Sequence, residues 1–98
     1  MENANVADSV ISQVAFENNN RNAIVDGTDI LVRGKGIIIT DTVHYNDNDR
    51  KGYLINLGGS SENCIVNNVM GVRARVLNNS ANYKVPNNGT GNTVGLVK

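Results

Sequence analysis

The densest group of side chains able to do chemistry is the run of residues 44–51, His-Tyr-Asn-Asp-Asn-Asp-Arg-Lys. It gathers an imidazole, an aromatic ring, carboxylates and cations between two apolar segments, so we expect a polar turn. Carboxylate and amide oxygens are the hard ligands that Ca²⁺ prefers, and they also hydrogen-bond sugars. The residues we expect to contact a sugar or Ca²⁺ are His44, Tyr45, Asn46, Asp47, Asp49 and Arg50. A solvated loop without a ligand explains the same composition.

The turn does not complete a recognisable metal or catalytic motif. It begins like an EF-hand loop, but the bidentate Glu of that motif is missing, so we predict no defined metal site and no cofactor. A glycosidase needs paired carboxylates; Asp41 and Glu17 are available on neighbouring segments, without a distinctive motif around them. His44 is the sole histidine, and no nucleophile elbow accompanies it. We predict no catalytic residues and favour binding over catalysis, while enzyme activity stays open.

The composition indicates an all-β protein with many tight turns. Val and Ile are abundant, aromatic residues make up only 4% of the chain, and the 98 residues include 18 Asn and 10 Gly. Asn and Gly favour turns and disfavour helices, whereas β-branched residues favour strands. Nine basic residues balance nine acidic ones, so the sequence shows no electrostatic surface for nucleic acid or an anionic membrane.

Three further features bear on location and redox chemistry. The single Cys64 lies in the apolar run Cys64-Ile65-Val66, so we expect a buried, inert thiol and no internal disulfide. No apolar stretch approaches the roughly 20 residues of a membrane span, so we expect no membrane insertion. The N-terminal residues lack the basic start and apolar run of a signal peptide, so any extracellular role requires another route of release.

A weak internal repeat organises the apolar residues. Segments beginning at Ile11, Ile39 and Ile65, spaced by 28 and 26 residues, each pass through small polar residues and return to an apolar one. Such a spacing suits one coil of a solenoid, in which neighbouring coils bury a continuous apolar column. We therefore predict two core columns, formed by Ile11, Ile39 and Ile65 and by Val14, Val43 and Val69.

The repeat predicts a short right-handed parallel β-helix of about three coils. We place a flexible lead at residues 1–8 and a single β-helix domain at residues 9–98. The alternative is an antiparallel β-sandwich in which the Asn-rich segments are hairpin loops. The apolar triplet Ile37-Ile38-Ile39 and the recurrence itself favour the β-helix over the sandwich.

Two residues mark contacts between coils in this scheme. Asn68 precedes Val69 and is the best candidate for a buried turn amide, because Asn tolerates left-handed backbone and its amide can bond to neighbouring coils. Phe16 aligns with His44 or Tyr45 of the next coil, so we expect an internal stack. A sugar-stacking platform of Phe16, Tyr45 and Tyr53 is the alternative.

Residues 36–43 and 58–69 give the chain a resemblance to the pectate-lyase-like right-handed β-helix superfamily, most closely to the tailspike, tail-fibre and appendage proteins of bacteriophages. The resemblance implies a virion or extracellular location, a homotrimer and binding of host-surface carbohydrate. It also leaves two alternatives: a fragment of a polysaccharide lyase or glycoside hydrolase, and a C-terminal trimerisation module of a longer fibre. Because so few coils leave open strand edges, we expect the chain to associate with copies of itself or with a parent fibre chain.

Overall fold

The structure is a computed structural model that describes residues 2–3, 8–17, 28–45, 53–72 and 84–98. This part of the chain is all-β, as the composition predicts. Its strands are β1 (Glu2–Asn3), β2 (Val10–Glu17), β3 (Thr28–Val32), β4 (Ile38–Tyr45), β5 (Tyr53–Leu57), β6 (Ile65–Val72) and β7 (Thr93–Val94).

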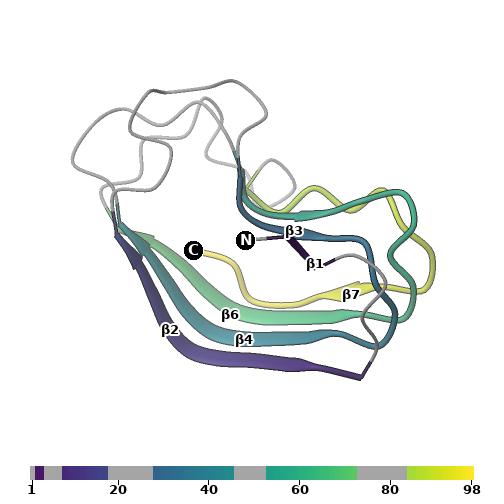
Figure 1. Cartoon of the computed structure of the whole chain (residues 1–98). Helices are drawn as coiled ribbons and strands as arrows, with labels where there is room; N and C mark the ends of the chain where they lie inside the picture. Colours follow the sequence, from purple (N-terminus) through teal and green to yellow (C-terminus); the bar gives the residue numbers. More distant parts are fainter. Residues whose placement is uncertain (1, 4–7, 18–27, 46–52, 73–83) are drawn as a thin grey trace.

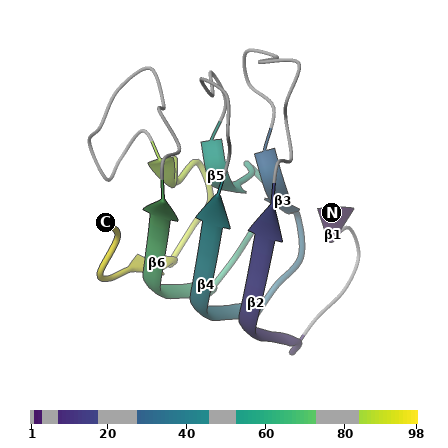
Figure 2. The same ribbon diagram turned by 90° about the vertical axis from the view of Figure 1, so that its left-hand side faces the viewer.

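The strands form two parallel sheets. One has the order β1-β3-β5 and the other the order β2-β4-β6-β7. Consecutive strands from β1 to β6 alternate between the two sheets. One strand of each sheet, such as β3 followed by β4, makes up one circuit of the chain. Successive circuits lie side by side (Figures 1 and 2). Every pairing between these described strands is parallel, so the antiparallel sandwich is wrong for them.

The predicted Ile column is correct at two positions and wrong at the third. Ile11 pairs in register with Ile39, and Ile39 pairs with Val66, which in turn pairs with Val94. Val66 is fully buried, whereas Ile65 is 45% exposed. A shift of one residue moves a strand residue to the opposite face of the sheet, so Ile65 points outward.

The predicted Val column needs the same correction. Val14 pairs with Thr42, and Thr42 pairs with Val69. Val43 belongs to a different row, between Ala15 and Met70, and is 38% exposed. The inward row therefore contains a buried threonine where the sequence predicted a valine.

The core lies between the two sheets, and Ile11 and Phe16 of β2 pack against it half-buried. The free Cys64 belongs to this core, which confirms the predicted buried thiol. The buried apolar residues are Ile30, Val32, Ile37, Ile39, Leu54, Ile55, Leu57, Cys64, Val66, Val69 and Val85.

The strands of the larger sheet turn a corner at one residue with left-handed backbone. Gln13, Asp41 and Asn68 have φ values of 56°, 57° and 52° and occupy equivalent places in successive circuits. The Asn68 Nδ2 atom donates to Asp41 Oδ1 at 2.6 Å. Asn68 therefore links circuits as predicted, but it is exposed and not buried. The corner forms a convex ridge on the sheet (Figure 1).

A second row of left-handed residues precedes the strands of this sheet. It consists of Asp8, Gly36, Asn63 and Gly91, with φ values of 55°, 64°, 53° and 68°. A Cβ atom on Gly36 would lie 2.7 Å from Asp8 Oδ1, and one on Gly91 would overlap Asn63 Oδ1. Glycine is required at both places, because an acidic or amide side chain of the preceding circuit lies where its Cβ would be.

The segment predicted as a flexible lead contributes to the fold. Its residues Glu2–Asn3 form β1, which pairs with Leu31 and Val32 of β3. The backbone N–H of Asp8 donates to the Lys35 carbonyl at 3.1 Å.

Candidate functional site

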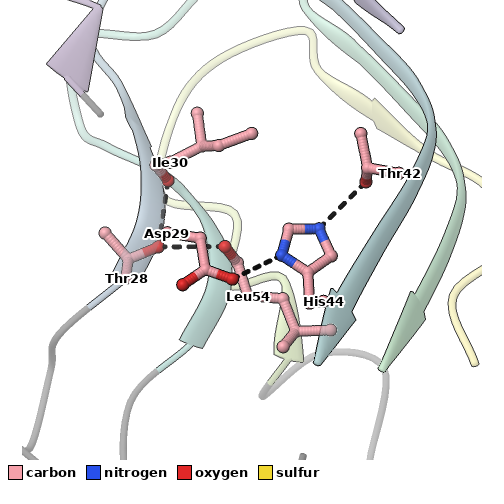
Figure 3. Close-up of polar contacts among 6 residues, drawn as sticks. All are labelled: Thr28, Asp29, Ile30, Thr42, His44 and Leu54. Atoms are coloured by element: carbon pink, nitrogen blue, oxygen red, sulfur yellow. Dashed lines mark hydrogen bonds and ion pairs between the residues drawn. The ribbon is translucent and has the colours of Figure 1, made fainter. Parts of the chain in front are cut away.

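Three polar side chains meet inside the core and form the most chemically organised group in the described chain (Figure 3). Asp29 comes from β3, and Thr42 and His44 come from β4. His44 Nδ1 lies 2.5 Å from Asp29 Oδ2, and His44 Nε2 lies 2.9 Å from Thr42 Oγ1. Asp29, Thr42 and His44 are 3%, 1% and 0% exposed. We call these residues the buried trio.

Local strand geometry explains why the trio assembles. After the corner at Asp41, residues 42 and 44 lie on the same inward face of β4, because strand side chains alternate. Asp29 faces them from the opposite sheet. The neighbouring Thr28 hydroxyl lies within hydrogen-bond distance of the Ile30 and Leu54 carbonyls, at 3.0 and 3.3 Å, which fixes the start of β3 (Figure 3).

The imidazole of His44 is also fixed from the adjacent circuits. The Phe16 ring stacks on it with a centroid separation of 5.0 Å and an interplanar angle of 6°. Gly71 is its register partner on the other side. The predicted stack between Phe16 and His44 is therefore confirmed, and Phe16 is used inside the stack of circuits.

The order hydroxyl, imidazole, carboxylate resembles that of a nucleophilic triad. An ionised Asp29 carboxylate only accepts hydrogen bonds, so it holds the hydrogen on His44 Nδ1 and leaves Nε2 facing the Thr42 hydroxyl. A nucleophile must reach substrate, however, and the Thr42 side chain is sealed in the core. The trio therefore acts as a satisfied polar network that specifies which residues face one another across the sheets.

The structure separates the residues predicted to form the binding turn. His44 is fully buried, so its assignment to an exposed turn is wrong. Tyr45 ends β4, is half-buried, and pairs in register with Glu17 and Val72. Asn46, Asp47, Asp49 and Arg50 lie outside the described residues, so their predicted contacts with sugar or Ca²⁺ stay predictions.

The described residues offer few other sites. They contain no group of three or more His, Cys, Asp or Glu side chains able to hold a metal ion. No helix in this part of the chain is long and apolar enough to cross a membrane. Tyr53, the remaining member of the predicted aromatic platform, begins β5 in the other sheet and is half-buried.

The outward surface of β2, β4 and β6 carries the most distinctive exposed pattern, and we call it the outer face. Two apolar rows run across the circuits on it: Val10, Ile38 and Ile65, and then Ala15, Val43 and Met70. Apart from the half-buried Thr40, side chains between these rows are polar and exposed: Ser12, Asn67 and the ridge residues Gln13, Asp41 and Asn68. The apolar members other than Ala15 are between 37% and 64% exposed. The sequence prediction missed this face because it placed Ile65 and Val43 in the core.

Comparison with known proteins adds no relative: no family model, no curated protein and no solved structure matches the chain.

Proposed function

We propose that the chain is a short right-handed parallel β-helix that serves as an assembly module of a phage or prophage tail spike, fibre or appendage, where it forms a homotrimer. The outer face is the observation that carries the proposal. Within residues 10–15, 38–43 and 65–70 the only charged side chain is Asp41. By strand dimensions this part of the face measures roughly 20 Å by 14 Å, and exposed apolar residues bordered by polar ones mark interaction sites on other proteins.

The two parallel sheets and the regular recurrence of left-handed residues support the β-helix. Equivalent corner residues recur after 28 and 27 residues in both rows, at positions 13, 41 and 68 and at positions 8, 36 and 63. Crossovers between parallel strands are right-handed in nearly all proteins, which supports the proposed hand.

The ridge supports a cyclic assembly in preference to a two-fold dimer. The ridge is the bend in β2, β4 and β6 (Figure 1). It divides the outer face into two flanks: in β4, Ile38 precedes the corner residue Asp41 and Val43 follows it. In a heterologous ring each subunit uses two different patches, one against each neighbour. A convex ridge with two different apolar flanks meets that requirement when the ridge points toward a threefold axis. Resemblance to the trimeric spikes supports the same stoichiometry and a location on the virion.

Sedimentation equilibrium tests the trimer directly. We expect the wild-type chain to have three times its 10.5 kDa mass at about 50 µM, a concentration at which μM affinities populate complexes. Ile65→Glu and Val43→Glu each place a charge on one flank and are expected to give folded monomers. Ile65→Val keeps the flank apolar, and Ser60→Glu adds the same charge at an exposed turn outside the outer face; both are expected to remain trimeric. A monomeric wild-type chain would overturn the proposal.

Carbohydrate binding is the second candidate, and the polar row between the flanks favours it. Ser12 and Thr40 present hydroxyls at register-paired positions along the stack, and Asn67 adds its Nδ2 group, while its Oδ1 atom accepts from Leu96 N at 2.8 Å. Polar groups repeated at strand spacing can hydrogen-bond an extended polysaccharide. A panel of surface polysaccharides measured by isothermal titration calorimetry tests it: binding lost in Ser12→Ala/Thr40→Val supports this row, and no binding to any polymer contradicts it. A reducing-end assay on the same panel tests the lyase or hydrolase alternative.

A further inference from the structure

The two ends of the stack of circuits are complementary to each other. At the C-terminal end lies an open hollow of about 580 Å³, lined by Val85, Pro86, Asn87, Asn88 and Val94. Val85 and Val94 come from opposite sides of the core, and Val94 continues the inward row of Ile39 and Val66. Val85 is already buried, whereas Val94 is half-buried, so Val94 is the apolar residue of the hollow that one more circuit would cover.

The N-terminal end supplies side chains of the required kind. β2 pairs with β4 on one side and forms the edge of its sheet. Val14 belongs to an inward row but is 37% exposed, because the described chain places no circuit beyond it in the sheet. Ile11, which begins the other inward row, is half-buried.

We propose that a second copy of this chain docks its N-terminal end onto this C-terminal end, so that copies stack head to tail. The inward row Ile11, Ile39, Val66 and Val94 then continues with Ile11 of the next copy. The other row ends at Val97, which bridges to Val69, and continues with the next Val14. This inference goes beyond the lateral trimer and uses the two ends of the stack; of the outer face it uses only the backbone N–H of Val10.

We expect the backbone hydrogen bonds at the junction to have the same pattern as those between circuits within one chain. Ile38 N donates to the Ser9 carbonyl, Ile65 N to the Ile37 carbonyl and Thr93 N to the Cys64 carbonyl, at 2.9, 2.9 and 2.8 Å. The next member of this series joins Val10 N of the docking copy to the Asn92 carbonyl. Addition of a strand to an exposed sheet edge is an established mode of protein association.

The row of left-handed residues favours a second copy over an unrelated occupant. Along the stack it alternates Asp8, Gly36, Asn63, Gly91, and each acidic or amide side chain lies over the glycine of the following circuit. In a circuit beyond Gly91 this place takes a residue with left-handed backbone, which Asp and Asn adopt more readily than other residues that carry a side chain. Asp8 of a second copy is such a residue, and it arrives in the same register as Val10, Ile11 and Val14.

A head-to-tail contact does not close on itself, so it produces linear stacks that lengthen with concentration.

Two variants block one end each. Val10→Pro removes the donor at the N-terminal edge, where Pro is tolerated at the first residue of an edge strand, and Val94→Lys puts a charge into the hollow. We expect each to raise the apparent dissociation constant of stacking by about tenfold or more, since each removes a junction hydrogen bond or apolar contact. The matched controls are Val10→Ala, which keeps the backbone donor, and Val94→Ile, which keeps an apolar side chain in the hollow. Both are expected to stack like the wild type.

Mixing the two blocked variants gives the decisive result. Val10→Pro retains a free C-terminal end and Val94→Lys a free N-terminal end, so an equimolar mixture forms one junction and stops at twice the mass of the separate variants in analytical ultracentrifugation. Both variants carry Ile65→Glu in this experiment, because mixed lateral trimers would otherwise have free sites at both ends and would not stop at one junction. A wild-type mass that does not change with concentration, or a mixture whose mass stays that of the separate variants, would overturn head-to-tail stacking. Ile65→Glu, which tests the trimer, leaves both ends intact, so the two proposals can fail separately.

Discussion

Replacing the buried trio one residue at a time is expected to destabilise the protein far more than replacing all three together. The adjacent circuits already show apolar residues at the same places: Val14 and Val69 beside Thr42, Phe16 beside His44, and Leu54 beside Asp29. The three substitutions Asp29→Leu, His44→Phe and Thr42→Val therefore give the central circuit the residues that the adjacent circuits have at the same places.

The expected magnitudes follow from burial. Asp29→Leu removes the carboxylate that lies 2.5 Å from His44 Nδ1, and His44 is fully buried. Asp29→Leu leaves the buried His44 Nδ1–H without an acceptor, which costs about 1–3 kcal/mol, whereas replacing the whole group by packed apolar residues is often neutral or stabilising. At about 4–8 °C per kcal/mol for a domain of this size, the single change is expected to lower Tm by roughly 5–25 °C. The triple variant is expected within about 1 kcal/mol of the wild type, or above it.

Urea unfolding followed by far-ultraviolet circular dichroism measures these differences, provided that the m value is unchanged between variants. His44→Phe alone serves as the reciprocal single variant, since it leaves Asp29 buried without its imidazole, and we expect a similar loss. The interaction free energy of the trio is the difference between the triple variant and the sum of the three single ones. A triple variant as unstable as Asp29→Leu, or a neutral Asp29→Leu, would refute the described role of the trio.

Three further predictions concern single positions. Val69→Asn is expected to lose about 2–4 kcal/mol in urea unfolding, because it puts an amide into the inward row where Val69 is 1% exposed; a neutral result would remove Val69 from that row. Asn68→Ala is expected to lose about 1–2 kcal/mol and Asn68→Gly less, because Gly keeps the left-handed backbone and loses only the bond to Asp41; equal losses would show that backbone conformation does not matter there. Cys64 is expected to react with Ellman's reagent only after unfolding, since its thiol is fully buried; fast labelling of the native protein would contradict its place in the core.

The repeat could be predicted from the sequence because apolar residues of similar size recur at nearly constant spacing. Ile11 and Ile39 are register partners, as that spacing indicates. The third member was displaced by one residue because Cys64, Ile65 and Val66 are all apolar, so the pattern does not show which two of them face inward. Because strand side chains alternate between the two faces, an error of one residue replaces the core residue Val66 by the surface residue Ile65.

The buried trio could not be predicted because its members come from different strands. Asp29 is 15 residues before His44 and lies in the opposite sheet, so no local spacing joins them. His44 also stands directly before a strongly polar run, which favoured its assignment to the loop. The sequence does contain one signal for the trio. Thr42 and His44 are two residues apart, so both side chains lie on the same face of the strand, and this face is the one that buries Ile39.

Disulfide cross-linking between adjacent circuits tests the parallel register that defines the stack of circuits. In a Cys64→Ser background, Ser12→Cys/Thr40→Cys places two thiols on register partners, whose Cα separation of about 4.8 Å suits a disulfide. Val10→Cys/Thr40→Cys is the control, with both thiols on the same face of the sheet but offset by two residues. We predict near-complete intramolecular oxidation of the first pair and little of the second, measured by mass spectrometry under mild oxidation. Equal oxidation of both pairs, or preferential oxidation of the offset pair, would contradict the stacked parallel circuits.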